Sequence, residues 1–270
     1  MIREASKKGT IHPISISTDN EIRDFLGSEN SEYPMPGQLI DLNIDHHFLC
    51  LIDRLAKNHS ILRQTDIQIR SGPDLLEEYT GALQKMSAMK RRANSKPKLS
   101  DFDVLFLKNY NNYINDIQRA YDMLQNTAYS QFRETALSQN SICHNNLKKD
   151  AIIFSCNSAY ISNFFHATND YYLVDLSNII LRYLKYNGSP VPMSQVLDTY
   201  NTHNPLHKHE LEILYVMLMY PGSFIKTCMR YYEKHRSYLP QNILRSLNTA
   251  LDKRDFLLKY IEDISYSSLI

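Results

Sequence analysis

Glycine and tryptophan are the scarce residues of this 270-residue chain, which contains 7 Gly and no Trp. Loops that cradle phosphate groups and tight hairpin turns both depend on glycine, because glycine adopts positive φ without steric cost. The shortage therefore argues against enzymes built on glycine-rich loops and against sheet-rich folds. With 43% hydrophobic residues the chain can still bury a core, so we expect a globular, mainly helical protein.

Strong net charge and long apolar runs are also lacking. The formal net charge of +1 gives no indication of nucleic-acid binding, and we interpret the basic run at 90–92 as a solvated helix end. No segment has the apolar core of a signal peptide or the length to span a bilayer, so we expect synthesis in the cytoplasm. The four Cys have neither metal-ligand spacing nor the density of a disulfide scaffold, and buried free thiols are expected.

Apolar residues at three- and four-residue spacing predict a series of amphipathic helices. A short strand is predicted over 10–17, followed by a short helix that ends near Leu26. Two strands over 151–154 and 159–164 form a predicted hairpin. The helices are predicted over 45–62, 74–93, 102–124, 172–186, 192–200, 208–220, 222–235 and 241–264.

A single hairpin inside a helical body matches the C-terminal lobe of a protein-kinase-like fold. In such lobes the hairpin joins the catalytic loop to the metal-binding loop. The expected fold class is therefore mainly α (α+β), with one small β-hairpin and a truncated N-terminal lobe. Residues 1–36 would be a remnant N-terminal segment, and residues 37–270 would form the kinase-like helical C-lobe.

Several motifs carry a more specific resemblance, which covers about residues 37–264. The motifs are Leu55-Ala56-Lys57-Asn58-His59, Ile142-Cys143-His144, Val174-Asp175-Leu176-Ser177, Tyr200-Asn201 with Asn204-Pro205-Leu206, and Met229-Arg230-Tyr231-Tyr232. On these motifs the chain resembles the CotS-type spore coat proteins of endospore-forming bacteria, which are relatives of aminoglycoside phosphotransferases and choline kinases.

The catalytic loop of that family reads His-Gly-Asp and then, a few residues later, His-Asn. The resemblance places His144 at the first His, Asn146 at the catalytic Asp, Asp150 at the second His and Ala151 at the metal-binding Asn. An amide cannot accept a proton as a carboxylate does, and Ala has no ligand oxygen.

The second metal-binding loop follows the hairpin. There Phe165 occupies the position of the magnesium-binding Asp, and a phenyl ring cannot coordinate a hard cation. Asn163 could donate one weak ligand oxygen. Asp175, in contrast, matches a family Asp that hydrogen-bonds the catalytic loop, and a structural role is expected for it.

These losses led to the hypothesis of a catalytically inactive kinase-like spore coat or sporulation protein, not an enzyme, that acts as a structural or binding module. No cofactor and no metal are expected for this chain, although active relatives would use ATP and magnesium. We expect other spore coat or sporulation proteins as partners, with no nucleic acid and no membrane span. Synthesis in the mother cell and a place in the spore coat are expected.

Two alternatives remain open at this stage. One is a residual small-molecule phosphotransferase with an atypical site that uses Asp150, Asn146, His144 or Asp170. The other is a degraded relic with no selected role, for example from an incomplete gene model. A metal site is not favoured: the rings of His46 and His47 would point apart on a helix, and His203, His207 and His209, considered with His166, are interpreted as part of a surface loop.

Overall fold

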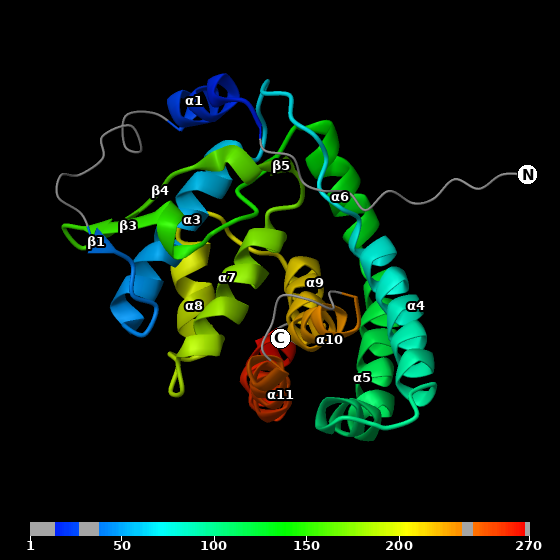
Figure 1. Cartoon of the computed structure of the whole chain (residues 1–270). Helices are drawn as coiled ribbons and strands as arrows, with labels where there is room; N and C mark the ends of the chain where they lie inside the picture. The colour runs from blue at the N-terminus through cyan, green and yellow to red at the C-terminus, as the bar shows by residue number, and fades with distance from the viewer. Residues whose placement is uncertain (1–13, 27–37, 234–239, 268–270) are drawn as a thin grey trace, which may run out of the picture.

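The computed structural model describes residues 14–26, 38–233 and 240–267, which form a helical body with small sheets on one side (Figure 1). The helices in chain order are α1 (Ile16–Phe25), α3 (Asp45–Leu62), α4 (Leu75–Asn94), α5 (Asp101–Gln125), α6 (Tyr129–Ser138), α7 (Leu173–Tyr186), α8 (Met193–Asn201), α9 (Lys208–Met219), α10 (Gly222–Glu233) and α11 (Pro240–Ser267).

The mainly helical fold class is confirmed, and the helices predicted from residue 45 onward are present with small differences at their ends. The sequence prediction missed α6. The strand predicted over 10–17 is wrong at Ile16 and Ser17, which begin α1 because the Ser15 side chain caps this helix by accepting from the N–H of Thr18 at 3.1 Å. The start of that strand lies outside the described residues.

The predicted hairpin is present as β3 (Ile152–Ser155) and β4 (Ser158–Ile161). Its turn residues Cys156 and Asn157 have φ of 49° and 59°, the backbone geometry that a two-residue hairpin turn requires. The sequence predicts this hairpin as the only sheet in the helical body, but the structure has two further strand pairs. Strand β1 (Gln38–Leu39) pairs antiparallel with β3, and β2 (Ile142–Cys143) pairs antiparallel with β5 (Thr168–Asn169).

Side-chain caps set the starts of the two long helices α4 and α5. Asp74 accepts from the N–H of Leu76 at 2.8 Å. Ser100 and Asp103 form a reciprocal capping box in which each side chain accepts from the backbone N–H of the other residue. Both caps satisfy N–H groups that have no partner within the helix, so they fix where each helix begins.

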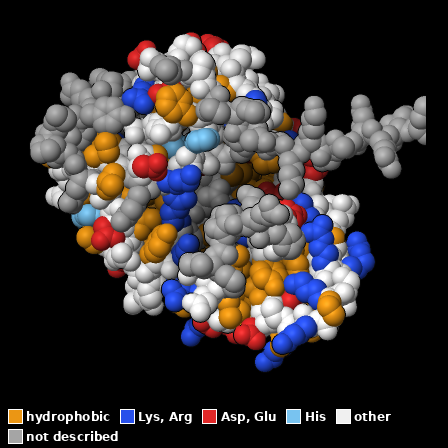
Figure 2. Space-filling view, in the orientation of Figure 1, with side chains coloured by type: hydrophobic (Ala, Val, Ile, Leu, Met, Phe, Trp, Pro, Cys, Tyr) orange, Lys and Arg blue, Asp and Glu red, His pale blue; other side chains and the backbone are white. Residues whose placement is uncertain are grey.

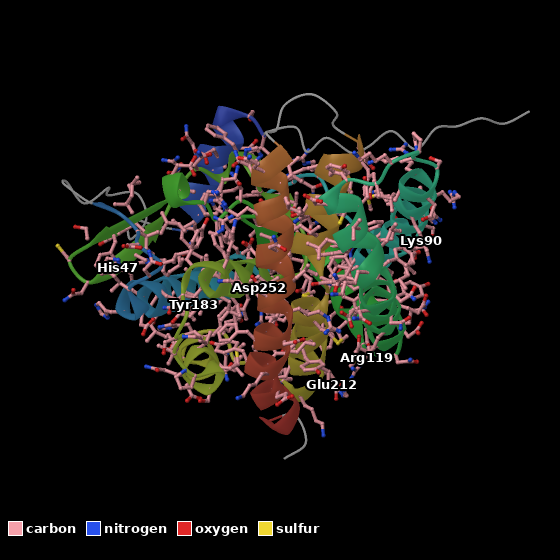
Figure 3. All side chains as sticks on the ribbon, turned by 60° about the horizontal axis from the view of Figure 1, so that its bottom comes forward. His47, Lys90, Arg119, Tyr183, Glu212 and Asp252 are labelled. Atoms are coloured by element: carbon pink, nitrogen blue, oxygen red, sulfur yellow. The ribbon has the colours of Figure 1, made fainter. Side chains whose placement is uncertain are left out.

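The buried side chains form two clusters. The larger one joins α3, α7, α8 and α9 to the sheets, and Phe48 of α3 stacks on Tyr183 of α7 with ring centroids 3.7 Å apart. The smaller one joins the α4–α5 pair to α10 and α11, and there Tyr113 stacks on Phe224 at 3.6 Å. Figure 3 shows α11 between the side that carries His47 and Tyr183 and the side that carries Lys90 and Arg119.

Helix α1 lies against the short 3₁₀ turn Phe164–His166 that follows β4. The carboxylate of Asp19 accepts from the N–H of Phe164 at 2.6 Å, and the N–H of Ile14 donates to the carbonyl of Phe165 at 2.8 Å. The segment before the helical body therefore supports the loop that the resemblance assigns to metal binding. The division into a remnant segment at 1–36 and a C-lobe at 37–270 stays a prediction.

Candidate ligand site in the kinase-like cleft

Asp175, in the first turn of α7, holds the loop that follows β2. Its two carboxylate oxygens accept from the backbone N–H of His144 at 2.6 Å and of Asn145 at 2.8 Å. Nε2 of His59, on α3, lies 3.5 Å from the same carboxylate. Burial alone would raise the pKa of Asp175, but His59, His144 and the N–H of Asn145 outweigh it and lower the pKa below its usual range.

His144 joins this loop to the end of the hairpin. Its Nε2 donates to the carbonyl of Ser162 at 2.8 Å, and its Nδ1 accepts from the N–H of Asn146 at 3.2 Å. These bonds fix a neutral tautomer, and burial lowers the pKa of the imidazole. Both ring nitrogens are occupied, so the geometry gives His144 a role in holding the loop.

Asn145 occupies the position of the glycine in the catalytic loop of the resembling family. Its φ is 59°, in the left-handed region, and asparagine tolerates this region better than most residues. Its side-chain amide donates to the hydroxyl of Thr168 at 3.3 Å. Asn145 therefore keeps the left-handed backbone conformation that glycine favours and adds a polar side chain at this position.

The remaining residues carried over from the resemblance do not come together into a site. Asp150 is exposed, Ala151 is buried, and the carbonyl of Ala151 accepts from the N–H of Ser162 at 2.9 Å. Asn163 has a φ of 63° and a buried side-chain oxygen without a hydrogen-bond partner. Phe165 is half-buried.

Magnesium does not fit the two expected metal positions. Ala151 and Phe165 have no side-chain oxygen, and the unpartnered oxygen of Asn163 is a single donor where magnesium needs several. Across the described ranges, no three His, Cys, Asp or Glu side chains are grouped as a metal site would require.

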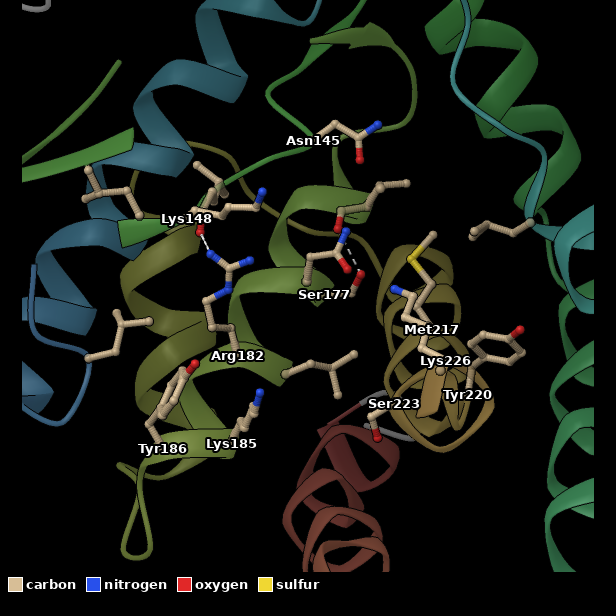
Figure 4. Close-up of a pocket in the computed structure, with 18 of the residues that line it drawn as sticks. Asn145, Lys148, Ser177, Arg182, Lys185, Tyr186, Met217, Tyr220, Ser223 and Lys226 are labelled. Carbon is tan, nitrogen blue, oxygen red and sulfur yellow. Dashed lines mark hydrogen bonds between the residues drawn. The ribbon is translucent and has the colours of Figure 1, made fainter. Parts of the chain in front are cut away.

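A cavity of about 820 Å³ lies between this loop and the helical body (Figure 4). The segment 40–43 after β1 and Ile152 of β3 form one end, and α4, α9 and α10 form the other. Tyr79 and Tyr220 stack with ring centroids 3.9 Å apart and line that second end. From the loop itself, Asn145, Leu147 and Lys148 line the cavity, whereas His144, Asn146, Asp150 and Ala151 do not.

Asp170 is the buried carboxylate of this cavity. Its Oδ1 accepts from the N–H of Tyr171 at 2.8 Å, and its Oδ2 is buried without a hydrogen-bond partner. Gly72 packs directly against it, since a Cβ on Gly72 would lie 1.9 Å from Oδ2. Burial, which the Tyr171 N–H and Arg133 only partly offset, raises the pKa of Asp170 to about 7. Of the residues named for an atypical site, Asp170 is the one that lines the cavity.

Four basic side chains of the cavity wall were not predicted as site residues. Lys148 comes from the loop, Arg182 and Lys185 from α7, and Lys226 from α10 (Figure 4). Figure 2 shows Lys and Arg side chains along one side of the hollow in the middle of this face. The α7 residues carry a signal in the sequence, because Val174, Asn178, Leu181 and Lys185 recur at three- and four-residue spacing and line the cavity together.

The loop held by a buried aspartate and open to a helical cavity defines a kinase-like phosphotransferase fold. The chain is similar to an aminoglycoside phosphotransferase from Alicyclobacillus acidocaldarius subsp. acidocaldarius DSM 446, with a TM-score of 0.79 and 13% identity over 95% of this chain and 85% of that chain. It is also similar to a choline/ethanolamine kinase family protein from Mesorhizobium loti, with a TM-score of 0.51 and 9% identity over 88% and 71% of the two chains. At these identities the similarity shows the fold alone.

Residues 55–264 match the family described as spore coat putative kinase YutH, and the chain belongs to that family. The resemblance to kinase-like spore coat proteins is thereby confirmed. No curated protein matches the chain. None of the described helices combines the length and the hydropathy that crossing a membrane requires.

The prediction that the chain is not an enzyme is wrong on these findings. The family is described as a putative kinase, and the fold is that of phosphotransferases. The prediction rested on replaced side chains at Asn146, Ala151 and Phe165 and on the truncated N-terminal lobe. Asp170, named for the alternative of an atypical site, lines the cavity.

Proposed function

We propose that this chain acts in the spore coat as a binding module whose kinase-like cleft takes a small-molecule ligand, with other spore coat proteins as its partners. The observation that carries the proposal is the 820 Å³ cavity, which is within the range of small-molecule sites and is lined by both apolar and charged side chains. Synthesis in the mother cell before assembly into the coat is part of the same proposal.

The loop framework supports a binding role. Asp175 and His144 fix the backbone that carries Asn145, Leu147 and Lys148, so one wall of the cavity is held by buried hydrogen bonds. A preformed wall lowers the ordering cost of binding a ligand. The names of the structural neighbours do not carry over as ligands, because only the fold is shared.

Ligand-induced thermal stabilisation of the full chain tests the proposal, with ATP plus magnesium, glucose, glucose 6-phosphate, kanamycin and choline as probes. A ligand at one hundred times its dissociation constant adds about 2.7 kcal/mol to the free energy of unfolding. Val174→Phe should abolish the shift because Val174 lines the cavity. Val104→Phe is the matched control, since Val104 is 53% exposed on α5.

The proposal predicts a shift for at least one probe in the parent and in Val104→Phe, and none in Val174→Phe. Equal shifts in all three proteins, or no shift with any probe, would refute a ligand site in this cavity. Recovery of the protein in purified spore coat extracts, against its absence there, tests the location.

Phosphoryl transfer is a second candidate function, and the state of Asp170 favours it. A carboxylate with a pKa of about 7 and a free oxygen in a cavity has the properties of a general base at neutral pH. Asp170 would accept the proton of an acceptor hydroxyl as the new P–O bond forms and ADP leaves.

A radiolabelled-ATP assay with magnesium or manganese tests this second candidate. Turnover should fall with decreasing pH below about 7 and should drop by about 100-fold or more in Asp170→Asn. Asp252→Asn, on an exposed position of α11, is the matched control. Turnover that survives Asp170→Asn, or that Asp150→Ala abolishes instead, would exclude Asp170 as the base.

A further inference from the structure

The wall of the cavity is rich in positive charge. Lys148, Arg182, Lys185 and Lys226 come from three separate parts of the chain, the loop before β3, α7 and α10, and all four line the same space. In Figure 4, Lys148, Arg182 and Lys185 lie on one side of the cavity and Lys226 on the other. Lys148, Lys185 and Lys226 are exposed, so water screens their mutual repulsion and their ammonium groups are accessible to an anionic ligand.

Asp150 interacts favourably with Arg182, whereas the three lysines of this set differ. Within the described ranges, no carboxylate forms an ion pair with Lys148, Lys185 or Lys226. Arg182 donates to the backbone carbonyl of Leu147. Its guanidinium is partly desolvated, and this burial lowers its pKa.

The acidic residues of the cavity leave the positive charge in excess. Asp41 accepts from the backbone N–H and the side-chain amide of Asn43, at 3.0 and 2.8 Å. Asp170 is close to half-protonated at neutral pH because its pKa is about 7. Glu78 is exposed at the start of α4. A cationic ligand would therefore meet four cations against two or fewer fully charged carboxylates.

The lining that carries the four cations also contains apolar side chains. Leu147, Val174 and Leu181 line the cavity beside them. Lys185 and Lys226 additionally line a second cavity of about 350 Å³ next to α11, so they lie at the boundary between the two spaces. A ligand with one anionic group and an uncharged body matches this division.

We infer that the ligand of this cavity is a small organic phosphate whose phosphoryl group is bound by basic side chains of the wall, Lys185 and Lys226 among them. This inference rests on the proposed function and names the ligand class of the same site. Phosphate oxygens accept charge-assisted hydrogen bonds from guanidinium and ammonium groups, which are stronger than those between neutral groups. The volume accommodates a phosphorylated sugar.

Isothermal titration calorimetry on the full chain tests the ligand class. The probes are glucose 6-phosphate and inorganic pyrophosphate, with glucose and choline as their uncharged and cationic counterparts. Glucose 6-phosphate should bind, and should bind more weakly as the salt concentration rises. Pyrophosphate that binds as well as glucose 6-phosphate would show that the phosphoryl group alone is recognised, and would overturn the inference of an organic phosphate.

The double variant Lys185→Gln with Lys226→Gln should weaken glucose 6-phosphate binding about tenfold or more, because two cations of the wall are lost. Lys85→Gln with Lys108→Gln is the matched control: it removes the same charge from exposed positions on α4 and α5. The control should bind as the parent does. Equal weakening in both double variants would overturn the inference, because the effect would then come from net charge alone.

The outcomes separate the inference from the proposed function. Binding of glucose or choline in preference to glucose 6-phosphate, lost in Val174→Phe, would refute the organic phosphate and keep the binding module. Failure of every probe to bind would refute both. Circular dichroism and melting temperatures equal to those of the parent establish that the lysine variants are folded.

Discussion

Two sets of polar groups, one that holds the loop after β2 and one that lines the cavity, differ in their hydrogen bonding. The framework set, Asp175, His144 and His59, is buried and each member has partners within hydrogen-bond distance. In the cavity set, Oδ2 of Asp170 has no partner, and Lys185 and Lys226 have no carboxylate partner among the described residues. Satisfied groups stabilise the fold, whereas unsatisfied groups in a cavity are those that a ligand can satisfy.

The comparison predicts that substitutions in the two sets act on different quantities. Changes in the framework set should lower the free energy of unfolding. Changes in the cavity set should leave it unchanged or raise it, while altering the response to pH or to ligands.

The largest expected effect is that of Asp175→Ala. The substitution leaves the N–H groups of His144 and Asn145 without their carboxylate partner in a buried site, so we expect a loss of about 3–5 kcal/mol in the free energy of unfolding. Urea denaturation measures it. Asp252→Ala, at an exposed position, should change the value by less than about 0.5 kcal/mol. A loss below that of the control would mean that Asp175 does not support the loop.

The next largest effect is a pH-dependent increase in the free energy of unfolding of the variant Asp170→Asn. The folded-state pKa of about 7 lies above that of an unfolded Asp, so the native state binds this proton more tightly. The contribution of Asp170 to stability is therefore present at low pH and is lost as pH rises through about 7. Asn remains neutral, and Asp170→Asn should exceed the parent by about 2–4 kcal/mol at pH 8, with the difference shrinking toward pH 4.

Urea denaturation at several pH values measures this difference, with Asp252→Asn as the control that should show no such trend. A difference between Asp170→Asn and the parent that stays constant from pH 4 to pH 8 would contradict a buried, proton-binding Asp170.

Gly72→Ala should have a smaller, destabilising effect. The added methyl group would lie 1.9 Å from Oδ2 of Asp170, so backbone or side chain must shift, at a cost of about 1–3 kcal/mol. Gly81→Ala is the matched control: nothing lies within 4 Å of its Cβ in α4, and alanine in a helix interior should stabilise by about 0.5–1 kcal/mol. In the double variant, Asp170→Ala should reduce the loss of stability that Gly72→Ala causes. If it does not, the contact between residue 72 and Asp170 is not the cause of that loss.

Much of the fold could be predicted from the sequence because its signals are local. The capping residues Asp74 and Ser100 and the apolar stripe of α5 define helices without any tertiary information. The hairpin followed from two apolar runs around a short polar turn. Helix α6 was missed because Ala128, at its N-cap, provides no side-chain cap and its apolar stripe is short.

The cavity could be predicted only in part, because it depends on residues that meet through the fold. Lys148 and Lys226 are separated by most of the C-terminal half of the chain, and no local pattern pairs them. The sequence did direct attention to the loop, but to Asn146 and Asp150, which do not line the cavity. Asp170 was named as one of four residues that could serve an atypical site. Its burial against Gly72, which gives it a raised pKa, exists only in the folded chain.

The smallest expected effect on stability is that of Lys185→Met with Lys226→Met. These cations have no carboxylate partner among the described residues, so their loss should change the free energy of unfolding by less than about 0.5 kcal/mol. Lys253→Met is the contrasting variant, because Nζ of Lys253 donates to the carbonyl of Leu184 at 2.8 Å and its loss should cost about 1 kcal/mol. Urea denaturation separates the two, and a double variant as costly as Lys253→Met would show that Lys185 and Lys226 belong with the framework.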